Sequence, residues 1–184
     1  MGIKTVKRVF SSIRAIVNLA IAEEGLDCSN AFAKTYFPDD DNAQSRQPIS
    51  IQDIRKVQSL CREIDDEMRW LIALISDTGM RLSEAVGLIA DDIVLDQTQP
   101  YINLTKHPHR RLKTDASERV IPLVGASLWA ARRIKATTTN RFCFGRYCSE
   151  ENCNSNSASA AINKWIKTIV GSEGVIHGLR HGFR

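Results

Sequence analysis

The sequence lacks an apolar run of the length that a membrane span requires. Its first stretch, MGIKTVKRVFSSIRAIVNLAIAEE, is amphipathic and ends on two glutamates, which is unlike a secretory signal with its small-residue cleavage site. Repeats and low-complexity tracts are also missing. We therefore expect a cytoplasmic globular protein of one domain, or one domain plus part of another, whose 43% hydrophobic content is sufficient for a core.

The cysteines lack the spacing of a disulfide framework. The five cysteines, an odd number, are Cys28, Cys61, Cys143, Cys148 and Cys153. Cytosolic proteins keep thiols reduced, so we expect reduced thiols at small buried or surface positions. The last three recur at every fifth residue, but no pair has the Cys-x-x-Cys spacing of structural zinc sites. The sequence predicts no metal site.

Neither sign of charge dominates, since the net charge is only +4, but the two signs are separated along the chain. Basic residues gather in 4–14, 106–119 and 132–146, and acidic residues gather in 39–41 and 63–67. This separation is typical of a protein with a phosphate-facing side. Charge runs are also common on merely solvated faces, so the pattern alone leaves both interpretations open.

Apolar residues spaced by three and four from Ile3 to Ile21 predict an amphipathic helix that Gly25 ends. Residues 28–47 break this pattern, and their FPDDDNAQSRQP segment has the composition of a linker. We place a domain boundary there. After it, Ser50 and Asp53 form a capping box that opens the next helix.

Periodicity in the remaining residues predicts mostly helices with a few short strands. Helices are expected around 54–61, 68–76, from 81, 127–136 and 157–170, with a last turn or helix from 178, and strands at 92–96, 101–104 and 119–124. The last two strands and their polar connection predict a long hairpin. The fold class is therefore α+β, mainly α-helical with a small antiparallel β-sheet.

Three separated segments carry candidate chemistry: TGMRLSE at 78–84, RRLKTDASERVIPL at 110–123 and HGLRHGF at 177–183. Each has an ordinary interpretation by itself. Arg81 and Glu84 could be a helix-surface ion pair. Lys113 could be an exposed turn lysine, and His177 a structural histidine. Their joint occurrence, in this order and in these local structures, favours a functional interpretation.

In this order the three segments resemble the boxes of the tyrosine recombinases, the phage integrase family. That family has an arginine in T-G-x-R-x-x-E, a lysine on a β-hairpin before a strand like R-V-I-P-L, then H-x-L-R-H, and finally a His or Trp and a tyrosine nucleophile. The resemblance runs from about Ser50 to the end. It implies a tyrosine recombinase catalytic-domain fold for 48–184, truncated at its C-terminus, and the C-terminal helix of a core-binding domain for 1–27, joined by the 28–47 linker.

The resemblance also implies roles for individual residues. The catalytic positions are Arg81, Lys113, His177 and Arg180, and the supporting positions are Glu84 and His181. Attack on a DNA phosphodiester builds negative charge that two guanidinium groups can bind. A lysine among cations can protonate the leaving 5′ oxygen, and a histidine can act as a base or orient the phosphate. Neither a metal nor another cofactor is expected. All four side chains should line one basic concavity.

The three tyrosines, Tyr36, Tyr101 and Tyr147, all precede Arg180, so by order none matches the nucleophile. The sequence thus predicts a site-specific DNA recombinase that acts through a phosphotyrosine intermediate, in a chain that lacks the nucleophile. One alternative is an inactive DNA-binding remnant. A second is an enzyme like the type IB topoisomerases, although the intact H-x-L-R-H favours the recombinase.

The implied partners are duplex DNA at a specific recombination site and other copies of the full-length recombinase, as a tetramer on DNA. The expected setting is the bacterial cytoplasm, on the DNA of a mobile element, with no membrane contact. The candidate DNA-binding residues are Lys4, Lys7, Arg8, Lys106, Arg110, Arg111 and Arg119.

Overall fold

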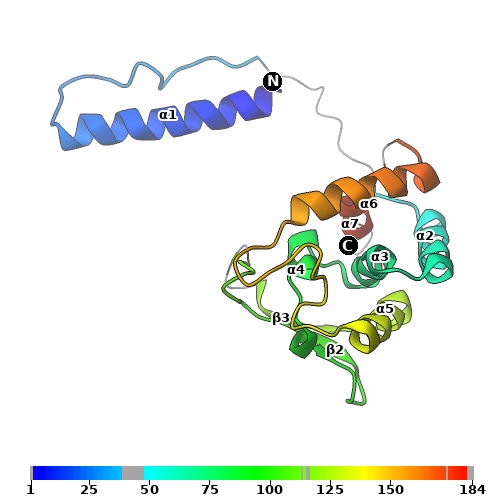
Figure 1. The fold of residues 1–184 in the computed structure, drawn as a ribbon. Helices are drawn as coiled ribbons and strands as arrows, with labels where there is room; N and C mark the ends of the chain where they lie inside the picture. The colour runs from blue at the N-terminus through cyan, green and yellow to red at the C-terminus, as the bar shows by residue number, and fades with distance from the viewer. Residues whose placement is uncertain (1, 39–47, 113, 115–116, 173, 182–184) are drawn as a thin grey trace. The chain divides into compact units, whose positions relative to one another are not determined.

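The computed structural model describes residues 2–38, 48–112, 114, 117–172 and 174–181 (Figure 1). The chain divides into two compact units, Met1–Ser45 and Arg46–Arg184. Among the described residues, no helix combines the length and the apolar character that crossing a membrane requires.

The first unit is one long helix with a returning segment. Helix α1 (Ile3–Glu23) buries none of its residues, and Gly25, at a φ of 60°, follows its end as the sequence predicts. The chain then runs back beside the helix (Figure 1). There, the Phe10 ring meets the Phe37 ring at 5.2 Å, and Arg14 Nε donates to the Phe32 carbonyl at 2.7 Å. The described part of the expected linker, 28–38, is therefore packed on α1.

The second unit is mainly helical, with one small sheet, which confirms the predicted fold class. Its elements are α2 (Ile51–Ile64), α3 (Glu67–Thr78), α4 (Leu82–Val86), η1 (Ala90–Asp92), β1 (Ile93–Val94), β2 (Tyr101–Leu104), β3 (Arg119–Pro122), α5 (Gly125–Thr137), α6 (Ser155–Val170) and α7 (Ile176–His181).

The sheet is antiparallel, in the order β1-β2-β3. Ile102 on the central strand pairs with Ile93 on one side and Ile121 on the other, and all three are buried. The next pair along, Asn103 and Val120, is exposed. This alternation follows the two-residue period of a strand and leaves one face of the sheet toward the core. The β2–β3 pairing is the hairpin that the sequence predicts.

Helix α3 lies at the centre of this unit, in contact with α2, α4, α5, α6 and α7. Its residues 71–76 are all buried, because the helix is apolar around most of its circumference in that stretch. Burying each large aliphatic side chain there contributes roughly 1.5–3 kcal/mol. The helix that leads into the first candidate box is thus held firmly.

Short-range signals set the ends of these helices. Ser50 Oγ accepts from the Asp53 N–H at 3.1 Å, so the predicted cap of α2 is confirmed. Gly79 ends α3 in the left-handed region, at φ 60° and ψ 19°, where a residue with Cβ is strained. Asp77, just before it, accepts from the N–H groups of Ala126 and Ser127 at 2.6 and 3.2 Å, which caps α5 from a distance.

The prediction of reduced thiols is wrong for one pair, because Cys148 and Cys153 form a disulfide. Their segments meet as an antiparallel bridge, a contact that spacing alone does not reveal. The other three cysteines are free. Cys61 and Cys143 are buried, and burial raises the pKa of each thiol to about 12.

Candidate functional site

Arg81 is the N-cap of α4 and is fixed by Glu84, three residues later. The Arg81 backbone N–H donates to Glu84 Oε2 at 2.9 Å, and Arg81 Nη1 donates to Oε1 at 2.6 Å. The left-handed turn at Gly79 ends α3 two residues before Arg81. Residues of the first box, Gly79 and Glu84, therefore set the position of Arg81.

Glu84 also binds a second arginine, Arg119, at the start of β3. Arg119 Nη2 donates to Glu84 Oε2 at 2.9 Å and its Nη1 donates to the Ser117 carbonyl at 2.8 Å. Burial would raise the pKa of Glu84, but hydrogen bonds from Arg119 and Arg81 outweigh it, and the pKa is lowered. Glu84 is 2% exposed while both arginines are 34% exposed, so one buried carboxylate holds two accessible guanidinium groups.

The third box lies against the first. His177, exposed, and Arg180, half-buried, stand on α7, which contacts α3 and α6. Both line a cavity of about 180 Å³ together with Met80 and Leu82, the two neighbours of Arg81 in the chain. The cavity wall also contains Ile75, Ser159 and Ile176. Segments about a hundred positions apart in the sequence are thus brought to one place.

Two predicted site residues fall outside what the structure describes. Lys113 lies in the connection between β2 and β3, outside the described residues. The backbone of His181 belongs to α7, but its side chain is also outside them. The paired strands on either side of the connection place its two ends, at Leu104 and Arg119, next to each other.

The predicted DNA-binding residues occupy several kinds of position. Lys4, Lys7 and Arg8 are exposed on α1, in the first unit. Lys106 and Arg111 are exposed on the β2–β3 connection of the second unit.

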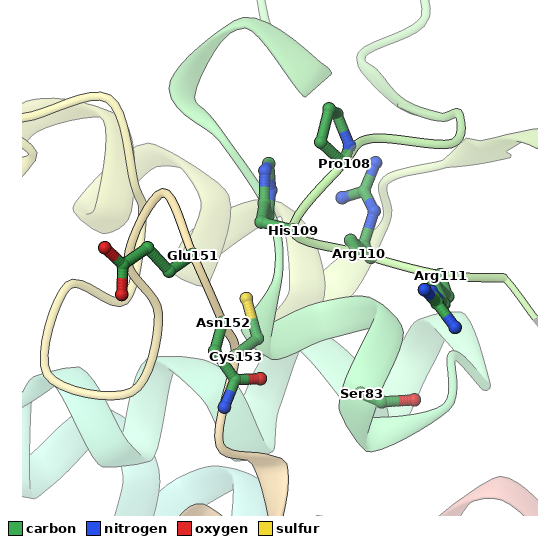
Figure 2. A pocket seen from close by; sticks show the side chains of 8 residues that line it. All are labelled: Ser83, Pro108, His109, Arg110, Arg111, Glu151, Asn152 and Cys153. Carbon is green, nitrogen blue, oxygen red and sulfur yellow. The ribbon is translucent and has the colours of Figure 1, made fainter.

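Arg110 differs from its neighbours, because it is buried and 2% exposed. Its Nη1 donates to Asp92 Oδ2 at 2.7 Å, and its Nη2 donates to the Thr105 carbonyl at 2.6 Å. The side chains of Arg110 and Arg111 point in different directions (Figure 2). Adjacent side chains of an extended chain point to opposite sides, so Arg110 can be buried while Arg111 faces solvent. Arg110 is therefore an interior structural residue, and the expectation that it lies on a DNA surface does not fit its position.

Sequence reasoning missed the links that hold this region together. Asp92 accepts from Arg110 and lies 3.2 Å from His107 Nε2. Glu84 was expected in a supporting role, but its bond to Arg119 spans 35 positions. No local pattern signals either contact, because both depend on how distant segments pack.

Residues 50–184 match the model of the phage integrase family. The chain belongs to the phage integrase family. The predicted resemblance is confirmed by this match. It covers all three boxes, from TGMRLSE to the end of the sequence.

Solved structures show the same fold. The Tn1549 transposon integrase in complex with circular intermediate DNA has a TM-score of 0.68 and 19% identity, over 100% of this chain and 66% of that one. A lambda integrase dimer bound to a COC′ core site has a TM-score of 0.68 and 16% identity, over 97% of this chain and 50% of that one. XerA recombinase has a TM-score of 0.55 and 16% identity, over 91% of this chain and 56% of that one.

The chain therefore spans 66% or less of the length of these three structures. No curated protein matches the sequence. At these identities the structural likeness establishes the fold, which is the predicted tyrosine recombinase catalytic-domain fold.

Proposed function

We propose that this chain forms the core of the catalytic domain of a site-specific DNA recombinase that cleaves and rejoins strands through a phosphotyrosine intermediate. The observation that carries the proposal is the cavity at which the first and third boxes meet. His177 and Arg180 line it beside the residues that flank Arg81. A family match over 50–184 and the fold support the same reaction class.

Arg81 and Arg180 bind the non-bridging oxygens of the scissile phosphate in this proposal. Guanidinium groups remain charged at any working pH and bind phosphate oxygens in pairs, which suits a transition state that gains negative charge. Glu84 contributes by orienting Arg81, with which it shares two hydrogen bonds. Glu84 is thus a positioning residue.

Lys113 is the proposed proton donor to the departing 5′ oxygen, and His177 the group that orients the phosphate or accepts the proton of the nucleophile. His177 is exposed and reachable by a bound phosphate. Lys113 belongs to the connection whose ends are fixed by β2 and β3. No step of this scheme needs a metal or a nucleotide.

The attacking tyrosine is proposed to lie beyond Arg184 in a longer form of the protein. All three tyrosines of this chain precede Arg180. Tyr147 is also 7% exposed and belongs to the core, which removes it as a nucleophile for a DNA phosphate. Tyr101 is paired in the sheet on β2.

Duplex DNA with a specific recombination site is the proposed substrate, and other copies of the full-length enzyme, as a tetramer, are the proposed partners. Lys106 and Arg111, exposed basic residues of the same β2–β3 connection as Lys113, suit a phosphate backbone. Such an enzyme would act on DNA in the bacterial cytoplasm.

The test is a covalent-trapping assay on a nicked suicide substrate, read on a denaturing gel that retains only covalent protein–DNA complexes. Residues 1–184 should give no adduct, whereas the protein extended with its natural downstream sequence should give one. Arg180→Ala in the extended protein should remove it. An adduct from residues 1–184 alone would refute the proposed origin of the nucleophile. An extended protein that binds DNA but never forms an adduct would identify an inactive DNA-binding remnant.

A further inference from the structure

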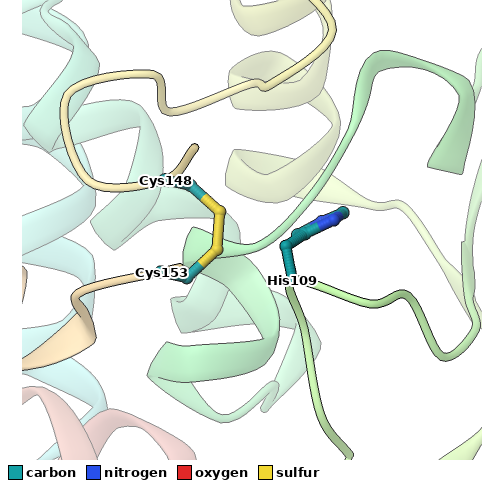
Figure 3. A group of neighbouring side chains, drawn as sticks. All are labelled: His109, Cys148 and Cys153. Atoms are coloured by element: carbon teal, nitrogen blue, oxygen red, sulfur yellow. A yellow bond between two sulfur atoms is a disulfide. The ribbon is translucent and has the colours of Figure 1, made fainter. Parts of the chain in front are cut away.

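Away from the cavity that His177 and Arg180 line, three side chains with metal-binding atoms gather in one place. A ring nitrogen of His109 and the sulfurs of Cys148 and Cys153 lie within 4.8 Å of one another (Figure 3). His109 comes from the β2–β3 connection, and the two cysteines come from the connection between α5 and α6. The cluster therefore joins two segments that are distant in the sequence.

The backbone presents the two sulfurs on the same side. The Ser149 N–H donates to the Asn152 carbonyl at 2.9 Å, and the Asn154 N–H donates to the Tyr147 carbonyl at 2.7 Å. These bonds flank the Cys148–Cys153 bridge, which makes it a non-hydrogen-bonded antiparallel pair. In such a pair the side chains share one face at close range, so the sulfurs stay neighbours with or without a bond between them.

The ring of His109 is fixed in one orientation. Its Nε2 lies 3.1 Å from the Gly87 carbonyl oxygen, which can only accept, so Nε2 carries the hydrogen. In the neutral ring the lone pair is then on Nδ1. The His107 ring stacks on it at 5.2 Å and the Phe142 ring meets it edge-on at 4.9 Å. A backbone carbonyl that accepts from the second ring nitrogen is the usual support of a metal-binding histidine.

We propose that these three side chains bind a zinc ion when the Cys148–Cys153 disulfide is reduced. A small thiol reductant supplies two electrons and two protons to break the S–S bond and is itself oxidised to a disulfide. Zinc then displaces one proton from each thiol and forms two Zn–S bonds and one Zn–N bond with His109. Two thiolates and an imidazole are a ligand set that suits Zn²⁺ and not Mg²⁺ or Ca²⁺.

The space around the cluster allows this geometry. Ligand atoms about a tetrahedral zinc are roughly 3.5–3.8 Å apart, given Zn–S and Zn–N bonds of about 2.3 and 2.0 Å. The three ligand atoms lie within 4.8 Å of one another, which is close to those separations. His109 and Cys153 also line a pocket of about 360 Å³ (Figure 2), which gives water access to the fourth position. The Cys-x₄-Cys spacing and the distant histidine explain why sequence spacing predicts no metal.

Zinc would join the β2–β3 connection, through His109, to the α5–α6 connection. His109 stands four residues before Lys113, so the metal would restrain the segment that carries the proposed proton donor. That effect on Lys113 rests on the proposed function, but metal binding itself does not. A failure of the covalent-trapping assay would leave the zinc proposal intact, and absence of metal binding would leave the recombinase proposal intact.

Cobalt(II) titration of the reduced protein tests the site, because Co²⁺ reports tetrahedral thiolate ligation by its visible and near-ultraviolet absorption. We expect one Co²⁺ per chain, displaced by Zn²⁺. Cys148→Ser, Cys153→Ser and His109→Asn should each weaken metal binding by about 100-fold or more, since loss even of an outer-shell partner costs roughly 10–100-fold. Cys28→Ser removes an exposed free thiol and His107→Asn removes the stacked neighbour, and both variants should keep the metal.

A second measurement needs no substitution, so it is independent of how well the variants fold. Wild-type protein oxidised with diamide should take up no Co²⁺, and reduction should restore the full uptake. The proposal is overturned if reduced wild-type protein takes up no metal, if oxidised protein takes up as much as reduced protein, or if folded His109→Asn protein binds as tightly as wild type.

Discussion

Arg81 and Glu84 are joined twice, once through the Arg81 backbone N–H at 2.9 Å and once through its Nη1 at 2.6 Å. A surface ion pair at this spacing would contribute about 0–1 kcal/mol. Here the carboxylate is 2% exposed and also holds Arg119, so both its oxygens are occupied. Glu84 therefore sets the position of the arginine to which we assign phosphate binding.

Glu84→Gln should lower the free energy of unfolding by about 2–4 kcal/mol. Removing one partner of a buried pair typically costs about 3–5 kcal/mol, and the partial exposure of both arginines reduces that cost. Urea denaturation followed by circular dichroism measures the change. The control is Glu150→Gln, whose partner Arg141 is 48% exposed and whose own side chain is 65% exposed. That variant should change stability by less than about 0.5 kcal/mol, and equal losses in both would contradict a special role for Glu84.

The stability that Glu84 contributes should depend on pH in the acid range. Its pKa is lowered in the folded state, so its contribution is complete above the ordinary value of 4.5 and is lost as the pH falls through the depressed folded value. The difference in unfolding free energy between wild type and Glu84→Gln should be constant from pH 7 to about 5.5 and shrink at lower pH. Taking the difference between the two proteins cancels the pH-dependent contributions of the other carboxyl groups, which both proteins share. If this difference in unfolding free energy instead grew at low pH, the pKa of Glu84 would be raised in the folded state, which would contradict the prediction.

Adjacent arginines should behave differently. Arg110 is 2% exposed, and Arg110→Ala would remove the guanidinium group that pairs with buried Asp92, so the change should cost about 3–5 kcal/mol of stability. Arg111→Ala, at an exposed position, should change stability by less than about 0.5 kcal/mol. Thermal or urea unfolding of the two variants checks this. Comparable stability of both proteins would place Arg110 at the surface after all.

The sequence predicts most of the local structure because local residues determine it. Ser50 and Asp53 cap α2 through contacts three residues apart, and Gly79 ends α3 because its left-handed backbone suits glycine. Strand alternation likewise places Ile102 inside and Asn103 outside. The helices and strands of the second unit follow from such short-range preferences.

Contacts between distant segments could not be predicted in this way. Which of Arg110 and Arg111 is buried depends on where Asp92 lies, and the Cys148–Cys153 bond depends on the register of two loop segments. The two arginine boxes are recognisable in the sequence, but the cavity that His177 and Arg180 share with Met80 arises only when α7 packs against α3 and α6.

Gly79→Ala should destabilise the protein and displace Arg81. An alanine at a φ of 60° costs about 1–2 kcal/mol, because its Cβ crowds the following carbonyl. A lower midpoint in thermal unfolding should result. Gly145→Ala is the matched control, since its added Cβ meets no atom within 4 Å. If the two variants melt alike, the left-handed turn does not constrain the approach to Arg81.

Duplex DNA should bind with strong salt dependence if the exposed basic residues face phosphates. Each phosphate contact adds about 0.9 to the slope of log affinity against log salt, because bound counterions are released. Arg111→Ala and Lys4→Ala, one in each unit, should each reduce that slope by about 1 while leaving the fold intact. The measurement is a salt titration of fluorescence anisotropy with labelled duplex, and single nucleotides should compete poorly. A flat titration, or slopes unchanged in both variants, would mean that these residues form solvated faces and that the protein contacts DNA elsewhere or not at all.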